Sequence, residues 1–104
     1  MSITIDSFTL RAAEHCVTGP ATALEYLTCL RLGPEGAPVD VRISFGTGPD
    51  AAIKAERLAL LCSARRRVRV VGSHLTPRTD HDVRACVLRD VTELSIDGVA
   101  ERLR

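Results

Sequence analysis

Aromatic residues are scarce in this sequence. Phe8, Tyr26 and Phe45 are its only phenylalanine and tyrosine side chains, and tryptophan is absent. A surface that binds ligands through many stacked rings is therefore excluded. No apolar run approaches the roughly 18 residues of a membrane-spanning helix. Residues 1–9 also lack the basic and then apolar pattern of a signal peptide. We expect no membrane association and a cytoplasmic location.

Motifs for enzymatic chemistry and for metal binding are also missing. The sequence has no P-loop, no G-x-S-x-G, no H-E-x-x-H and no glycine-rich dinucleotide turn. Its four cysteines never form the C-x-x-C spacing of zinc and redox sites. Each cysteine has apolar neighbours, so we expect reduced, buried thiols that pack as small hydrophobes. We predict a protein that is not an enzyme and holds no metal or cofactor.

What is present is the composition of one globular domain. The 104 residues are 45% hydrophobic and 26% charged, which is typical of a folded chain rather than a disordered one. This length suits a single domain covering residues 1–104 and is too short for two ordinary ones.

Three strands are predicted in the first half of the chain. Residues 39–45 alternate apolar and polar side chains, which is the period of a half-buried strand. Residues 22–32 form a second candidate, joined to it by turn-forming residues at 33–38. Residues 3–12 form the first strand, whose apolar phase changes near Asp6 and Ser7, so we expect a bulge or bend there.

The second half begins with a helix and ends in further strands. Pro49 is expected at an early helical position, and the helix continues to about residue 64, with Ile53, Leu58, Leu61 and Cys62 as its buried stripe. The next predicted strand covers 68–75 and contains Gly72, where a barrel strand can bend. A loop over 76–81 follows, and then a strand over 83–91 that extends past a kink to 96. This order predicts a mostly β fold, a five-stranded barrel of the oligonucleotide-binding (OB) type with one helix between strands three and four.

A family resemblance accompanies this order of elements. The residues that carry it are Ser44-Phe45-Gly46 before the helix, Leu60-Leu61 near its end, Val68-Arg69-Val70-Val71-Gly72, and Val87 to Leu94. They resemble the bacterial single-stranded DNA-binding proteins and their relatives, the family of primosomal replication protein N. That resemblance implies an OB barrel, single-stranded DNA as a partner, a homodimer, and replication or restart proteins as further partners. The aromatic stacking positions of the family are sparsely filled here.

Positive charge is concentrated in one stretch. The formal net charge is +1 overall, but residues 65–89 hold seven arginines and two aspartates, a balance of +5. The densest part is Arg65, Arg66, Arg67 and Arg69, hereafter the arginine cluster. Guanidinium groups bind phosphates in a fork geometry, which suits nucleic acid. Cations at a solvated helix end would also favour the helix dipole, and the sequence leaves both interpretations open.

Other candidate DNA-binding residues come from the strands and from the last loop. Arg42 lies on the polar side of its strand and Arg31 ends the preceding one, and strands two and three form the usual ligand surface of an OB fold. Tyr26 is either an exposed stacking ring on this surface or a core tyrosine. The loop over 76–81 carries Arg78, with Arg84 nearby, and in such folds this loop closes over a bound strand.

The function predicted from these residues is sequence-tolerant binding of single-stranded DNA. Arginines would follow the phosphate backbone, and Tyr26 would offer one ring. The alternative is a protein-interaction module of the same fold that does not bind nucleic acid, because one fold supports many activities. The scarcity of aromatic residues favours this alternative, and the arginine cluster favours DNA.

Overall fold

The computed structural model describes residues 2–33, 37–62, 65–80 and 83–103 of the chain. The fold is mostly β with one helix, and the helix lies between the third and fourth strands, as the sequence predicts. The elements are β1 Ile3–Thr18, β2 Glu25–Leu32, β3 Val39–Ser44, α1 Ala51–Leu61, β4 Arg67–Gly72, β5 His74–Asp80, β6 Val83–Arg89, β7 Glu93–Ile96 and β8 Val99–Ala100. Among the described residues, no helix is long and apolar enough to cross a membrane.

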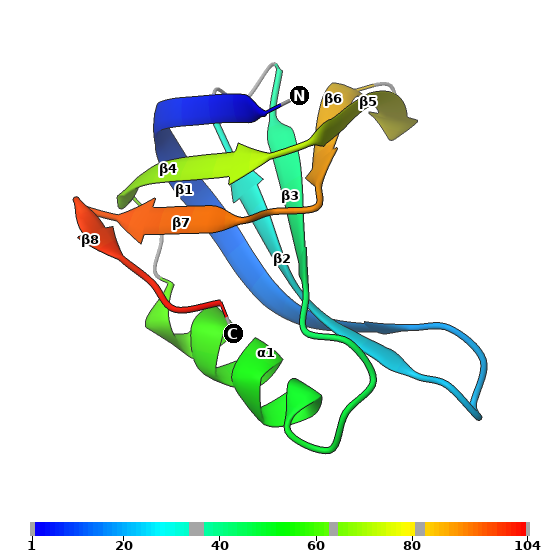
Figure 1. Ribbon diagram of the computed structural model, residues 1–104. Coiled ribbons are helices and arrows are strands. Elements are labelled where there is room, and N and C mark those ends of the chain that lie inside the picture. Colours follow the sequence, from blue (N-terminus) through cyan, green and yellow to red (C-terminus); the bar gives the residue numbers. More distant parts are fainter. Residues whose placement is uncertain (1, 34–36, 63–64, 81–82, 104) are drawn as a thin grey trace.

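The strands form one eight-stranded sheet in the order β5-β6-β3-β2-β1-β4-β7-β8. All neighbouring strands are antiparallel except β3 and β6, which are parallel over Val39–Val41 and Cys86–Leu88. The strands curve around a common core, while α1 lies across one end and the β1–β2 hairpin projects to the side (Figure 1).

The hydrophobic core is built from the inward-facing residues of these strands. Val41 and Ile43 of β3 are at most 2% exposed, and Val70 of β4 is fully buried. The alternating pattern of residues 39–45 predicts this phase, and it is confirmed. Phe45 is partly buried and packs against the same core, as its phase in the sequence indicates.

Strand β1 takes part in two ladders. Its first half pairs with β4 and its second half with β2, with register shifts between Ile5 and Phe8 and between Leu10 and Ala12. The predicted irregularity near Asp6 and Ser7 is therefore confirmed. The strand continues to Thr18, well beyond the predicted end at residue 12, because residues 13–18 pair with residues 25–30 of β2.

The helix is shorter and rotated compared with the prediction. Its N-cap is Asp50 and its last residue is Leu61, so Pro49 precedes the helix. The buried side is formed by Ala51, Ala55 and Leu58, together with Cys62 just after the helix, whereas Ile53 is 56% and Leu61 51% exposed. The predicted burial of these last two residues is wrong.

Close packing explains the rotation of the helix. The hydroxyl of Thr28 in β2, which is fully buried, donates a 2.7 Å hydrogen bond to the carbonyl of Ala55. Such a short approach between strand and helix leaves room only for small side chains. The alanine side therefore faces the sheet, and the larger residues are turned outward.

The chain between residues 73 and 92 also differs from the prediction. Ser73 alone separates β4 from β5, and residues 76–80, predicted as a loop, continue β5 and pair with β6. Strand β5 lies at the edge of the sheet, where Pro77 costs no ladder hydrogen bond. The predicted break between the strand over 83–91 and its extension to residue 96 exists, but it begins earlier than the predicted end at residue 91, because β6 ends at Arg89 and Asp90 has a φ of 53°.

Candidate nucleic-acid interface

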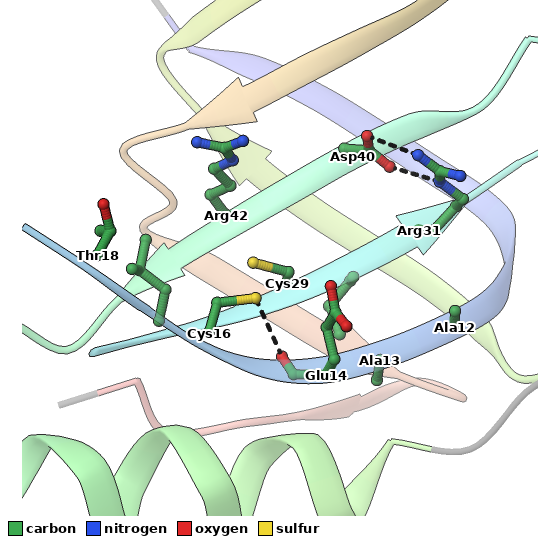
Figure 2. A pocket seen from close by; sticks show the side chains of 11 residues that line it. Ala12, Ala13, Glu14, Cys16, Thr18, Cys29, Arg31, Asp40 and Arg42 are labelled. Atoms are coloured by element: carbon green, nitrogen blue, oxygen red, sulfur yellow. Dashed lines mark hydrogen bonds and ion pairs between the residues drawn. The ribbon is translucent and has the colours of Figure 1, made fainter. Parts of the chain in front are cut away.

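A groove runs over the outer face of β1, β2 and β3. In β2 the residues Thr28, Leu30 and Leu32 face the core, so Cys29 and Arg31 point outward. Register places Glu14 of β1 and Arg42 of β3 on either side of Cys29, on the same face. These side chains line a hollow of about 570 Å³, which we call the β1–β3 groove (Figure 2).

A second hollow of about 590 Å³ adjoins the β1–β3 groove. The two hollows share Thr18, Leu27 and Arg42, and the second also includes Arg89 and Ser44. Arg42 is the cation common to both. Together the hollows provide a path across the sheet face from β1 to the end of β6.

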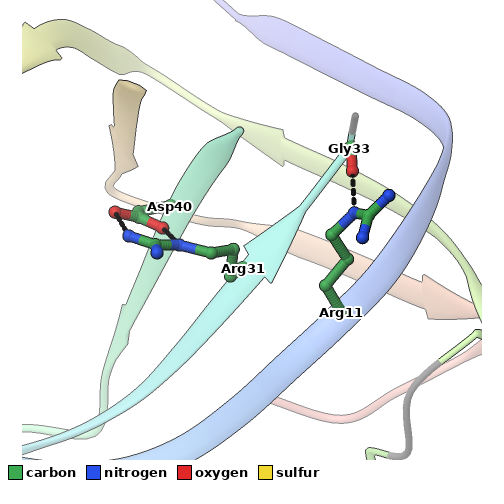
Figure 3. Close-up of polar contacts among 4 residues, drawn as sticks. All are labelled: Arg11, Arg31, Gly33 and Asp40. Carbon is green, nitrogen blue, oxygen red and sulfur yellow. Dashed lines mark hydrogen bonds and ion pairs between the residues drawn. The ribbon is translucent and has the colours of Figure 1, made fainter. Parts of the chain in front are cut away.

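Arg42 and Arg31 differ in their electrostatic surroundings. Arg31 forms two hydrogen bonds with Asp40 of β3, from Nε at 2.8 Å and from a terminal nitrogen at 3.0 Å (Figure 3). This paired carboxylate balances its charge. Arg42 makes no ion pair within the described residues, and its side chain is half-buried. Arg42 is therefore the better candidate to meet an anionic ligand.

Arg11 is a basic residue whose role the sequence does not indicate. Its Nε donates a 2.6 Å hydrogen bond to the carbonyl of Gly33 at the end of β2 (Figure 3). Gly33 has a φ of 95°, and a side chain there would collide with the ring of Phe8. Arg11 therefore stabilises a tight exit from β2 rather than adding a free cation.

The arginine cluster lies at the start of β4, and carboxylates surround it. Arg66 is 3.9 Å from Asp97, and Arg69 is 4.0 Å from Asp6 and 3.7 Å from Glu93. These are long, exposed ion pairs, which typically contribute 0 to about 1 kcal/mol. A phosphate could displace them at low cost.

The backbone around the cluster is firmly held. The amide of Arg65 donates to the carbonyl of Leu10 at 2.6 Å, and Arg65 has a φ of 72°. The amide of Arg67 donates to a carboxylate oxygen of Asp97 at 3.0 Å. In the sheet order, β1 and β2 separate β4 from β3. The cluster and Arg42 therefore belong to different parts of the surface.

Tyr26 lies on the opposite face of β2 from the β1–β3 groove. It shares the inward phase with Thr28, and its ring stacks on His15 of β1 with centroids 6.0 Å apart and planes at 23°. The structure therefore does not bring Tyr26 together with Arg42. The sequence does indicate this orientation, because residues 26, 28, 30 and 32 alternate in one phase and therefore share one face of the strand.

The last two candidates, Arg78 and Arg84, occupy the β5–β6 hairpin. Arg78 pairs with Ala85, and Arg84 pairs with Thr79. Their side chains, like residues 81 and 82 between the strands, lie outside the part of the chain that the structure describes. The hairpin nevertheless places both backbones on one ribbon next to β3.

Two cysteines stand side by side in the β1–β3 groove. Cys16 and Cys29 are both half-buried, and Figure 2 shows their sulphur atoms facing one another. Burial, and then the hydrogen bond and charge of Cys16, raise the pKa of Cys29 to about 12, while Arg42 acts in the opposite direction. Of the four thiols, only Cys62 is buried, and its pKa is raised mainly by that burial. The expectation of four buried cysteines is thus wrong for three of them.

Among the described residues, no group of three or more His, Cys, Asp and Glu side chains could hold a metal ion. Comparison with protein-family models, curated proteins and solved structures finds no match.

Proposed function

We propose that this chain is a non-enzymatic OB-type protein that binds single-stranded DNA without sequence preference. The observation that carries the proposal is the β1–β3 groove with Arg42, which lines both hollows and makes no ion pair with any residue that the structure describes. The outer face of strands two and three is where OB folds bind oligonucleotides. A half-buried cation in a hollow on that face suits a phosphate, whose charge-assisted bonds to arginine are strong.

Strand connectivity supports the OB barrel as the finer description of the fold. We treat β4 and β5 as one strand bent at Ser73, and β6 and β7 as one strand bent after Arg89. The pairings are then strand one with two and four, two with three, three in parallel with five, and four with five. Five strands paired in this circular order, with a helix between three and four, are the layout of an OB barrel.

The proposed mechanism relies on phosphate contacts more than on stacking. Arg42 would hold the backbone in the groove, and the arginine cluster would exchange its long carboxylate pairs for phosphates. Arg78 and Arg84 would act from the β5–β6 hairpin, which corresponds to a loop that contacts the strand in OB folds. Tyr26 is turned away from the groove, so base stacking, worth about 1–3 kcal/mol per base, adds little. We therefore expect weak, salt-sensitive binding.

The biological setting remains part of the proposal. It comprises a homodimer, whose two surfaces would raise affinity through avidity, a cytoplasmic location, and replication or restart proteins as further partners. These follow from the resemblance to the single-stranded DNA-binding and primosomal replication protein N family.

A protein-interaction module is the second candidate, and one observation favours it. On α1 the outward residues Ile53, Leu60 and Leu61 are all more than half exposed, and Leu60 reaches 79%. Three large apolar side chains on one short helix are a typical feature of a surface that contacts another protein.

A fluorescence-anisotropy titration with labelled single-stranded DNA at two salt concentrations tests the proposal. Arg42→Ala should weaken binding about tenfold, which corresponds to about 1.4 kcal/mol, as expected for a charged hydrogen bond. The double variant Arg66→Ala/Arg67→Ala should flatten the log–log salt dependence by about 0.7 per lost contact. Arg57→Ala, an exposed arginine on α1, is the matched control and should leave affinity unchanged.

The outcomes separate the two candidates. No measurable binding at low salt would contradict the DNA proposal and favour the interaction module. Equal loss in Arg42→Ala and Arg57→Ala would show that overall charge, not the groove, determines affinity.

A further inference from the structure

Cys16 and Cys29 form a pair defined by the sheet register. Cys16 of β1 pairs with Leu27, and Cys29 of β2 pairs with Glu14, so the two cysteines are diagonal neighbours on the same face of adjacent antiparallel strands. Their side chains turn toward each other in the β1–β3 groove (Figure 2). Two thiols are thus held side by side by the ladder and open to the hollow of the groove.

Diagonal spacing distinguishes the two reactions open to such a pair. Diagonal neighbours on an antiparallel ladder are about 7–8 Å apart, whereas a disulfide needs Cα atoms within about 4.4–6.8 Å. A direct S–S bond would therefore distort the ladder. An ion bonded to both sulphurs at about 2.3 Å, the usual zinc–thiolate length, lets the sulphurs stay up to about 4.6 Å apart. Bridging by an ion fits the spacing better than a disulfide.

The identity of the ion follows from the ligands. Zinc in structural sites takes four ligands, and no group of three possible ligands occurs among the described residues. Thiolates select soft ions, of which Cu(I) is the main biological example. We propose that Cys16 and Cys29 form a two-thiolate site for a soft monovalent ion, represented by Cu(I).

The charge balance of the site supports this assignment. When Cu⁺ binds, each thiol releases its proton to solvent and each sulphur forms one bond to the ion, with no electron transferred. The product carries one negative charge. Arg42 lies close enough to Cys29 to lower its pKa, so its guanidinium would stabilise that charge. Glu14 acts in the opposite direction.

The test is an anaerobic titration of the full chain with Cu(I) supplied as a coloured chelator complex, read as loss of the chelator's colour. We expect one Cu(I) per chain, and at least about a hundredfold weaker binding in Cys16→Ser and in Cys29→Ser. Cys86→Ser, another half-buried cysteine on β6, is the matched control and should bind like the unmodified protein. Because both thiols must release their protons to bind the ion, affinity should rise at least about tenfold per pH unit below the ordinary thiol pKa.

Several results would overturn the proposal. One is copper binding by the Cys16→Ser variant that equals the binding by the unmodified protein. Another is a loss in Cys86→Ser as large as that in Cys29→Ser. A doubling of the molecular mass in light scattering on copper addition would place the ion between chains instead of between β1 and β2. A circular-dichroism spectrum and a denaturation midpoint close to those of the unmodified protein establish that each variant is folded.

Discussion

The contact between Thr28 and Ala55 decides which side of α1 faces the sheet, and it can be tested by substitution. Thr28 is fully buried, and its hydroxyl donates to the Ala55 carbonyl at 2.7 Å. Thr28→Val replaces the hydroxyl with a methyl group of similar shape. Thr28→Ser keeps the donor and removes the methyl group, and Thr28→Ala removes both.

The expected magnitudes follow from the atoms removed. A buried hydrogen bond contributes about 1 kcal/mol net. The Ala55 carbonyl is also placed to accept the regular bond within the helix, so Thr28→Val should cost only about that amount. Loss of the buried methyl group should cost about 1 kcal/mol in Thr28→Ser. Thr28→Ala combines both losses and should cost about 2 kcal/mol.

The measurement is the free energy of unfolding from chemical denaturation of the four proteins. The expected order is unmodified protein first, then Thr28→Ser and Thr28→Val together, then Thr28→Ala. An unchanged midpoint in Thr28→Val would refute the role of the hydroxyl. Equal midpoints in Thr28→Ser and Thr28→Ala would show that it contributes nothing once the methyl group is gone.

Three further predictions concern the core, the groove and the assembly. Ile43→Ala and Val70→Ala should each lower the free energy of unfolding by about 2–4 kcal/mol, because both side chains are nearly fully buried; unchanged denaturation midpoints would contradict the core assignment. The pKa of Cys29 rises from 9.0 to about 12 on folding, so the unfolded state releases this proton at lower pH than the folded state. The free energy of unfolding should therefore be unaffected by this group below pH 9 and fall as pH rises from 9 to 12. Cys29→Ser should remove that part of the pH dependence in denaturation curves, whereas a pH profile equal to that of the unmodified protein would contradict it. We expect a homodimer, which light scattering at roughly tens of micromolar would detect as twice the chain mass; a mass of 11.3 kDa would contradict it.

Alternation in the sequence predicts the β elements well where one face is apolar and the other polar. Residues 39–45 have this pattern, and β3 covers nearly the same range with Val41 and Ile43 inside. Residues 76–80 lack an apolar face and contain Pro77, so they resemble a loop. Their strand exists because β6, the next segment of the chain, offers a pairing partner, and the pattern within residues 76–80 alone does not contain that pairing.

The helix shows a second limit of the sequence pattern. Hydrophobicity favours Ile53 and Leu61 as buried residues, but the sheet admits only the alanine side. The distance between the helix and β2 determines which side of the helix is buried. That distance depends on the contact with Thr28, which is 27 residues away from Ala55 in the sequence.

The candidate site was predictable in part. Alternation places Arg42 on the outer face of its strand, and the groove is found there. The same alternation indicates that Tyr26 lies on the opposite face. Its stacking on His15 follows from the register between β1 and β2, which the sequence pattern does not give. The carboxylates around the arginine cluster could not be anticipated, since Asp6, Glu93 and Asp97 come from strands and turns far along the chain.

The double membership of β1 has a consequence for how the molecule opens. In the register, residues up to Thr9 pair with β4 and residues from Leu10 onward pair with β2, so one continuous backbone belongs to both ladders. Neither ladder can separate without fraying the strand that the other requires. Amide protons on β2 and on β4 should therefore exchange with solvent through the same global opening, at similar free energies, rather than as independent units. The cooperative opening of the two ladders therefore depends on the one strand that they share, β1.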